Sequence, residues 1–427
     1  MATILLKGGE VFFPDGIVRK ADIVIDGQDI IHVGETDGSM NASEIIDCKN
    51  KLAVPGFINT HNHAAMTLFR SYADDMDLME WLKIKIWPAE EKLEKEDVYW
   101  GTMLAVAEMF KSGTTTFADM YFFMPEAARA VKESSCRASL SRGMSGLSPS
   151  AGIAIKESEE FFKEWHNSCD GLITVMLGPH APYTCPPDYL KRVIDLAGRL
   201  DAQIHIHLSE TATEVANCQK QYGKSPIALM NEIGLFELGT LAAHCVHVSD
   251  DDIEILRQKN VRVAHNPGSN MKLASGIAPV TKMLSSGICV ALGTDGASSN
   301  NNLDMLEEIR LAATLHKTVS LDPLAVPAGT AIKMATVQGA KALDLEKITG
   351  QIAPGFKADI TLFDMSALHW YPRHDIVSLL TYAASSSDVH TVIVNGKTVL
   401  KNRQLTTIDE ERLIFEINNR ALRLTGK

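Results

Sequence analysis

Residues 54–63 read VPGFINTHNH, a short apolar run that ends in two histidines one residue apart. Side chains alternate between the two faces of an extended strand, so His61 and His63 point the same way and Asn62 points the other way. Two imidazoles that project together from a strand end form half of a metal site, because a catalytic zinc-type site takes about three protein ligands and keeps a position for water. Hydrogen-bonded strand histidines are the alternative, so the rest of the chain must supply the further ligands.

The composition of the 427-residue chain is that of a soluble globular protein, with 45% hydrophobic and 22% charged residues. The net charge is −12 and there is no basic run, which argues against nucleic acid and anionic membranes as partners. Seven scattered cysteines without C-x-x-C spacing indicate reduced thiols. No stretch approaches the ~20 apolar residues of a membrane span, and MATILLKGGEVFF lacks the pattern of a secretory signal. We therefore expect a cytoplasmic protein.

Both ends of the chain carry short β-patterned runs, at residues 3–6, 11–13, 21–25 and 30–33 and again at residues 358–363, 389–394 and 398–400. Asp26-Gly27 separates two of the N-terminal runs and Asn395-Gly396 two of the C-terminal runs, as in β-hairpins. This pattern predicts a small β-sandwich module built from residues 1–57 and 350–427. Its expected role is structural, because neither end carries clustered ligand-type residues at a strand end.

Residues 58–349 alternate strand-like runs with helical stretches, as in a parallel sheet with crossover helices. Strands are expected at residues 56–61, 114–119, 138–142, 172–178, 203–208, 240–245, 261–265 and 289–295, and helices at 89–111, 187–200, 226–233, 250–259, 278–285 and 302–317. Eight such units predict an α/β fold of the (β/α)8 TIM-barrel type. An open doubly wound sheet is the alternative, although the sequence has no Gly-rich nucleotide loop.

A barrel enzyme places its chemistry at the carboxyl ends of its strands. Residues suited to metal binding or to acid–base chemistry occur at these positions, namely His180, His207, Glu210, His244 and Asp295. Taken alone, Asp295 would be a turn residue and Glu210 a helix-cap partner. Opposite three histidines, Asp295 is the natural fourth ligand, and a buried Glu210 beside a metal is favoured as a catalytic group. His205 is expected to be a packed or ligand-supporting interior residue.

Read together, several motifs resemble the amidohydrolase superfamily, and most closely its 5'-methylthioadenosine/S-adenosylhomocysteine deaminase branch. They are VPGFINTHNH, HLSE at 207–210, AAHCVH at 242–247, HNPGSNMKLASGIAP at 265–279 and GTDGASSNNNLDM at 293–305. The resemblance covers nearly the whole chain. It implies one metal ion per subunit, normally zinc with iron or manganese as alternatives, held by His61, His63, His207 and Asp295. No carbamylated lysine bridging two metals is implied.

The resemblance also implies substrate contacts. Glu90 in WPAE would contact the ribose hydroxyls, Arg142 in SRGM the amino-acid tail of the larger substrate, and His180 in GPHAPYT the purine. Many members have a second arginine about a dozen residues after the first, yet residues 143–155 contain none. Recognition of the carboxylate of S-adenosylhomocysteine is therefore expected to be weaker, and smaller nucleosides more competitive.

The implied reaction is zinc-dependent hydrolytic deamination of adenosine-type nucleosides (5'-methylthioadenosine, S-adenosylhomocysteine, adenosine, 5'-deoxyadenosine) to an inosine-type product and ammonia. Asp295 would accept the proton of the attacking water, His244 would orient that water, and Glu210 would protonate the purine at N1. Glu210 and Asp295 would therefore also contact the substrate.

The alternatives are an amidohydrolase deaminase acting on a free base or ring, such as guanine, 8-oxoguanine, a pterin or a triazine, and a non-catalytic nucleoside-binding or assembly protein. The loop at 66–90, with its tryptophans and methionines, is expected to pack as a lid over the substrate. Barrels of this type often associate into homo-oligomers, but the sequence shows no interface.

Overall fold

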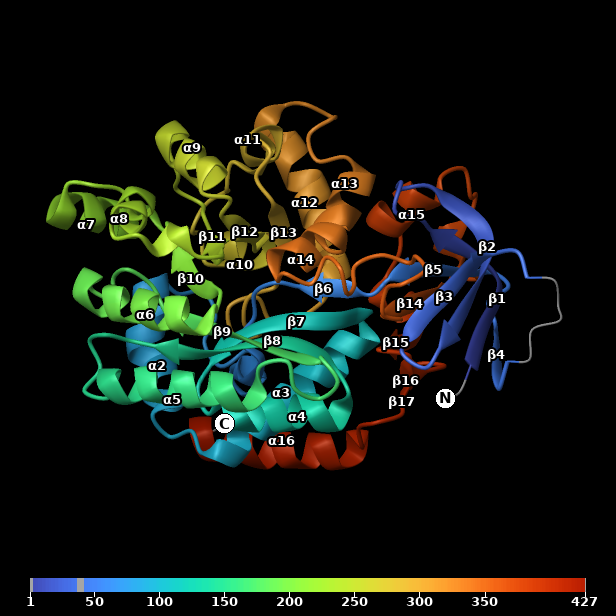
Figure 1. Ribbon diagram of the computed structural model, residues 1–427, viewed down its shortest axis with the longest axis horizontal. Coiled ribbons are helices and arrows are strands. Elements are labelled where there is room, and N and C mark those ends of the chain that lie inside the picture. Colours follow the sequence, from blue (N-terminus) through green and yellow to red (C-terminus); the bar gives the residue numbers. More distant parts are fainter. Residues whose placement is uncertain (1–2, 37–41, 427) are drawn as a thin grey trace.

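The computed structural model describes residues 3–36 and 42–426, so the outer bounds of the predicted module, residues 1 and 427, lie outside the described residues. An eight-stranded parallel sheet surrounded by helices lies beside a nine-stranded sheet formed by both chain ends (Figure 1). Within the described residues, no helix combines the length and the apolar character needed to cross a membrane.

The parallel sheet places its strands side by side in sequence order, as predicted. They are β6 (Phe57–Asn59), β7 (Thr114–Tyr121), β8 (Arg137–Met144), β9 (Ile173–Pro179), β10 (Ile204–Leu208), β11 (Thr240–His244), β12 (Arg262–His265) and β13 (Val290–Leu292). Two backbone hydrogen bonds join the first strand to the eighth. Thr60 N–H donates to the Leu292 carbonyl (2.9 Å), and Asp295 N–H donates to the His61 carbonyl (3.0 Å). The predicted (β/α)8 barrel is therefore confirmed, and the open sheet is not the fold.

The seam between these strands depends on Gly293. A Cβ atom at this position would lie 2.5 Å from the side-chain oxygen of Asn266 and 2.8 Å from the backbone nitrogen of His61. Both separations are too short for any side chain, so only glycine lets the end of the eighth strand lie directly against His61.

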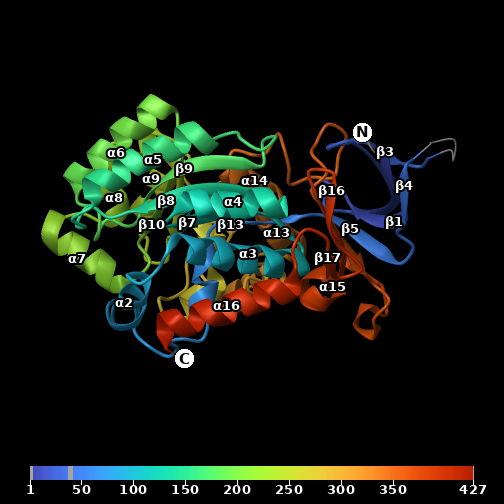
Figure 2. The same ribbon diagram turned by 90° about the horizontal axis from the view of Figure 1, so that it is seen from below.

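Helices cover the outside of the barrel (Figures 1 and 2). They are α1 (Leu78–Glu80), α2 (Trp87–Glu90), α3 (Lys95–Lys111), α4 (Met124–Ser134), α5 (Ala151–Trp165), α6 (Pro187–Leu200), α7 (Ala212–Tyr222), α8 (Pro226–Glu232), α9 (Asp250–Gln258), α10 (Pro267–Lys272), α11 (Val280–Ser285), α12 (Met305–Ser320), α13 (Ala328–Met334) and α14 (Val337–Ala342).

Two predicted helix starts are wrong, and seven helices within residues 58–349 were not expected. The stretch at 89–111 is not one helix, because Glu94 and Asp97 form a capping box that starts α3 at Lys95. The helix expected from residue 302 starts at Met305, where the Asp304 side chain accepts from Leu306 N–H (2.9 Å). The helices that were not predicted are α1, α4, α5, α7, α10, α13 and α14. Of the residues of α7 only Glu214 and Cys218 are buried, so the apolar periodicity that reveals helices is weak there.

The nine-stranded sheet confirms that both chain ends build one β module. Its strands are β1 (Thr3–Phe12), β2 (Val18–Asp26), β3 (Asp29–Gly34), β4 (Glu44–Asp47), β5 (Lys51–Pro55), β14 (Ile360–Asp364), β15 (Val389–Val394), β16 (Lys397–Lys401) and β17 (Gln404–Leu405). Antiparallel pairing of β5 with β14 joins the two ends. Side chains from both ends, among them Ile23 and Ile360, share a separate core.

The C-terminal segment returns from the module to the barrel. After α15 (Ile376–Tyr382) and the last strands, α16 (Glu410–Thr425) lies along α3 of the barrel (Figure 2). Arg420 and Arg423 both bind the buried carboxylate of Asp97, the first at 3.2 Å. The division into residues 1–57 with 350–427 and residues 58–349 stays a prediction.

A buried ion pair joins the barrel to the module. Arg137, at the start of β8, donates through Nε and Nη2 to the two carboxylate oxygens of Asp359 (2.8 and 3.3 Å). Both residues are only 1% exposed. Asp359 also accepts a hydrogen bond from the backbone N–H of Asn395 (2.6 Å). Each charge therefore depends on the other for compensation.

Replacing Asp359 by Ala should lower the free energy of unfolding by about 3–5 kcal/mol, because an uncompensated guanidinium would remain buried. Urea denaturation of the wild type, D359A, R137M and the double variant measures this loss. The double variant should lose less than the sum of the single variants. Strictly additive losses would show that the two side chains do not stabilise each other.

Candidate functional site

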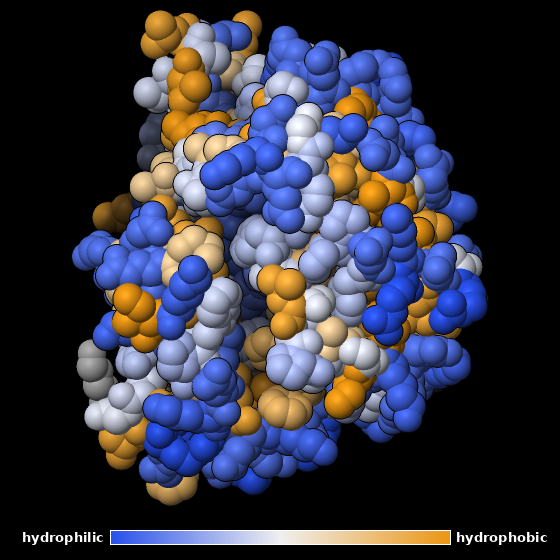
Figure 3. Space-filling model, turned by 90° about the vertical axis from the view of Figure 1, so that its left-hand side faces the viewer, coloured by the Kyte–Doolittle hydropathy of each residue, from blue (hydrophilic) through white to orange (hydrophobic). Residues whose placement is uncertain are grey.

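A cavity of about 980 Å³ opens at the carboxyl ends of the barrel strands. The corresponding face of the molecule, opposite the β module, is hollowed (Figure 3). Every predicted site residue except His61 lines this cavity, and His61 is completely buried beneath it. The lining residues among them are His63, Glu90, Arg142, His180, His207, Glu210, His244 and Asp295.

Two of the predicted metal ligands present bare ring nitrogens to each other. His63 donates through Nδ1 to the Met120 carbonyl (2.6 Å), and His207 donates through Nδ1 to the His180 carbonyl (2.7 Å). Each Nε2 atom therefore carries a lone pair, and the two Nε2 atoms lie only 3.2 Å apart. Lone pairs held this close repel one another unless a positive charge lies near both of them.

Asp295 supplies a carboxylate to the same point. Its Oδ1 atom lies 3.3 Å from Nε2 of both His61 and His63. Its Oδ2 atom accepts from Ser269 (2.6 Å) and Ser299 (2.8 Å). Burial alone would raise the pKa of Asp295, but the adjacent histidines, His61 first, hold it well below its usual range. The carboxyl group is therefore ionised and has a free oxygen for a cation.

The residues present fit a metal ion. Nε2 of His61 is buried and has no hydrogen-bond partner among the described residues, while its Nδ1 lies 2.8 Å from Nε2 of His205. His205 thus contacts a candidate ligand from behind, as expected. Burial lowers the pKa of His61 to about 3, so its imidazole is neutral and can coordinate.

Two overlapping groups of possible ligands converge here. They are His61 with His63 and Asp295, and His61 with His207 and His244, and the candidate ligand atoms of each group lie within 4.8 Å of one another. Together the two groups offer four imidazoles and one carboxylate, which are donors that suit zinc and related metals.

Glu210 and His244 lie side by side above these residues. His244 donates through Nδ1 to the side-chain oxygen of Asn270 (2.8 Å), which leaves Nε2 facing Glu210 at 3.9 Å. Ser275 donates a 3.4 Å hydrogen bond to Glu210. Burial raises the pKa of Glu210, so this carboxyl group holds a proton more readily near neutral pH than an exposed glutamate does. The pair can hold and move a proton at the cavity floor.

The backbone is strained at three of these strand ends. Ser209, His244 and Asp295 have φ angles of 52°, 73° and 61°, in the left-handed region that residues other than glycine rarely adopt. Such conformations cost of order 1–3 kcal/mol each and persist where surrounding contacts enforce them. Each of these three residues is a candidate ligand or lies within two residues of one, so the strain falls at the carboxyl ends of the strands.

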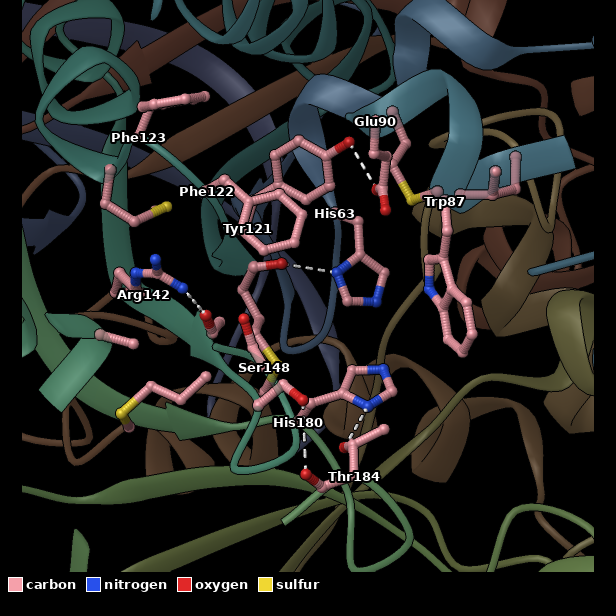
Figure 4. Close-up of a pocket in the computed structure, with 18 of the residues that line it drawn as sticks. His63, Trp87, Glu90, Tyr121, Phe122, Phe123, Arg142, Ser148, His180 and Thr184 are labelled. Carbon is pink, nitrogen blue, oxygen red and sulfur yellow. Dashed lines mark hydrogen bonds between the residues drawn. The ribbon is translucent and has the colours of Figure 1, made fainter. Parts of the chain in front are cut away.

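The predicted substrate-binding residues enter the same cavity from other elements (Figure 4). Glu90, at the end of α2, accepts a hydrogen bond from the hydroxyl of Tyr121 (2.7 Å), and burial raises the pKa of Glu90 to about 7. Nδ1 of His180 lies 2.9 Å from the Thr184 hydroxyl, and burial lowers the pKa of His180 to about 4. His180 is therefore neutral and leaves its Nε2 available to a ligand.

Arg142 also lines the cavity, but it is engaged by a partner that the sequence did not suggest. Its guanidinium donates through Nε to Glu157 of α5 (3.0 Å) and lies 5.7 Å from the centre of the Phe122 ring. The predicted lid contributes Trp81 and Trp87 to the lining, although its closure over a substrate stays a prediction.

Several residues that hydrogen-bond to the site residues were not predicted from the sequence. Ser269 and Asn270 lie in HNPGSN and Ser299 lies in GTDGASSN, so the motifs contain them without revealing their partners. Tyr121 lies outside all of the motifs described above. The position of Ser299 four residues after Asp295 was the one local signal, since a serine this close can reach back to the carboxylate.

Comparison with known proteins agrees with this geometry. The sequence model of the amidohydrolase family matches residues 52–399. A relative from Pelotomaculum thermopropionicum, named 5-methylthioadenosine/S-adenosylhomocysteine deaminase, is 54% identical with 100% of each chain covered. One of the same name from Dictyoglomus thermophilum is 53% identical with 99% of each chain covered. The crystal structure of an adenosine deaminase from Xanthomonas campestris with bound zinc has a TM-score of 0.95, 34% identity and 99% coverage of each chain.

Glu308 of α12 ties together the two loops that hold Asp295. Its carboxylate accepts from the backbone N–H of Gly268 (3.0 Å) and from the side chain of Asn300 (2.7 Å), the neighbours of Ser269 and Ser299. Glu308 is fully buried, and burial raises its pKa to about 8.

This raised pKa predicts a pH-dependent loss of stability. The folded-state pKa exceeds the ordinary value of 4.5, so the neutral carboxyl group is favoured in the fold. The contribution of this neutral carboxyl group to the free energy of unfolding is complete below pH 4.5 and is lost as the pH rises to about 8. E308Q keeps an acceptor but cannot ionise, so it should gain stability relative to the wild type over this range. Urea denaturation at three pH values tests this, and a pH-independent difference would contradict it.

Proposed function

The chain belongs to the amidohydrolase family, and from that premise we propose that it hydrolyses the 6-amino group of adenosine-type nucleosides to give an inosine-type nucleoside and ammonia. The observation that carries this proposal is the convergence of four candidate metal ligands with Glu210 and His244 on the floor of one cavity. Full-length identity of 54% to a relative named as a nucleoside deaminase supports the same reaction. The substrates are 5'-methylthioadenosine, S-adenosylhomocysteine, adenosine and 5'-deoxyadenosine.

The metal would be held by His61, His63, His207 and Asp295. Zinc is the proposed ion, because three imidazoles and one carboxylate suit it and the similar Xanthomonas campestris deaminase contains it. When bound, such an ion lowers the pKa of a water molecule to about 7 and so supplies a nucleophile at neutral pH.

Residues of the protein then accept and donate the protons of the reaction. Asp295 accepts the proton of the attacking water, for which its lowered pKa keeps it ionised. His244, fixed by Asn270, orients that water through Nε2. Glu210 donates a proton to N1 of the purine as oxygen adds to C6, and a proton delivered to the exocyclic nitrogen lets the C6–N bond break and ammonia leave.

Binding of the nucleoside would use the residues higher in the cavity. Glu90, held by Tyr121, provides an acceptor for the ribose hydroxyls. His180 would hydrogen-bond to the purine through its free ring nitrogen, and Arg142 would face the 5' substituent. A free base has no diol for Glu90, which favours nucleosides over guanine, 8-oxoguanine, pterins and triazines.

The cytoplasm is the proposed location, since the seven cysteines are all free thiols and suit a reducing compartment. Association into a homo-oligomer stays a prediction.

An ammonia-release assay over the four nucleosides, adenine and guanine tests the proposed function. The nucleosides should release ammonia and the free bases should not. Removal of metal with a chelator should abolish release, and added zinc should restore it. Ammonia from guanine alone would favour the free-base alternative, and nucleoside binding without ammonia would favour the non-catalytic one.

Replacing Glu210 by Gln should lower kcat by ~100-fold or more, the scale of a general acid contribution. The variant should keep its bound metal, because Glu210 is not among the proposed ligands. Steady-state kinetics with metal analysis of the same sample measures both quantities. Near-normal turnover would remove Glu210 from proton transfer, and lost metal would mean that it acts in the metal site.

A further inference from the structure

Glu157 already occupies the carboxylate-binding face of Arg142. One oxygen of Glu157 accepts a hydrogen bond from Nε of the guanidinium (3.0 Å) and lies 2.9 Å from Nη2 as an ion pair. The remaining nitrogen, Nη1, donates to the carbonyl of Gly143. All three guanidinium nitrogens therefore lie close to an oxygen of the protein itself before any substrate arrives.

A substrate carboxylate must compete for this arginine. Arginine binds carboxylates best through two parallel N–H bonds, and the Nε and Nη2 edge that offers such a pair is taken by Glu157. The side chain of Arg142 is 17% exposed and that of Glu157 is 50% exposed. Ion pairs this close to solvent are weak, so a bound tail can displace Glu157 at a modest cost.

The surroundings of Arg142 add to this competition. Two further carboxylates, Glu160 and Glu164, lie on the same helix as Glu157 and line the cavity. Glu91 and Glu126 line it from other elements, whereas the lysine and arginine side chains among the described lining residues are Lys95 and Arg142. This outer part of the cavity therefore carries an excess of negative charge, which repels the carboxylate of an amino-acid tail, although it also attracts the ammonium group of that tail.

We propose that Glu157 is a specificity-determining residue, which competes with the carboxylate of a substrate for Arg142 and so favours adenosine-type nucleosides whose 5' substituent carries no carboxylate. The inference rests on the proposed function, since it ranks the substrates of the same site. It makes 5'-methylthioadenosine and 5'-deoxyadenosine better substrates than S-adenosylhomocysteine, whose tail ends in an amino acid.

The test compares E157Q with the wild type on S-adenosylhomocysteine and 5'-methylthioadenosine. The ratio of kcat/KM for S-adenosylhomocysteine to that for 5'-methylthioadenosine should rise by about 2- to 5-fold, the order expected for release of a half-exposed ion pair. The gain should come from a lower KM for S-adenosylhomocysteine, because Glu157 acts on binding and not on the reacting atoms.

The matched control is E160Q, which removes the same charge from the same helix. Glu160 pairs with Lys156 (3.6 Å) and not with Arg142. Its effect on the ratio should be much smaller. In an R142M background, E157Q should give no gain, and R142M itself should impair S-adenosylhomocysteine more than adenosine.

An unchanged ratio in E157Q, an equal rise in E160Q, or a gain that persists without Arg142 would overturn the inference. The first outcome would show that Glu157 does not compete, and the others that only the general charge of the cavity matters. Failure of the proposed function is distinct, because the wild type would then release ammonia from neither nucleoside.

Discussion

The closure of the barrel between its first and eighth strands is the contact on which the candidate site depends. Thr60 and Leu292, 232 residues apart in the chain, are joined by a hydrogen bond from the Thr60 hydroxyl (2.8 Å) as well as by the backbone. This seam places Asp295 against His61, and Gly293 gives the backbone room to do so. If the strands separated, the carboxylate and the histidines would no longer converge. The candidate metal site and the closed sheet are thus one structural unit.

Much of this arrangement could be predicted from the sequence, because the carboxyl ends of all strands of a parallel barrel lie at the same end of the barrel. All eight strands occur where apolar periodicity predicts them, and the polar residues at their ends meet in one cavity. The contacts that fix those residues could not be read. The hydrogen bonds of Ser269 and Glu308 join loops distant in the sequence, and the pairing of Arg142 with Glu157 requires α5, a helix that was not predicted.

The side chains on the floor of the cavity differ in charge from those at its mouth. On the floor, burial keeps His61 and His207 neutral, and the pKa of Asp295 lies well below its usual range, so the site offers neutral imidazoles and a carboxylate to a cation. Toward the mouth, the charges of Glu157, Glu160 and Glu164 meet solvent and the incoming substrate. Variation of the mouth can therefore change which nucleoside enters without disturbing the chemistry below, as expected when loops and rims vary on a constant barrel.

The pairing of β5 with β14 also limits how early the β module can fold during translation. The two strands are separated by the whole barrel, about 300 residues of chain. At roughly 5–20 residues per second, β5 waits on the order of 15–60 s for its partner after it has been synthesised. During that interval one edge of an apolar strand is unpaired, a state that invites association between nascent chains. Protection of β5 against association during translation would therefore favour correct folding of the β module.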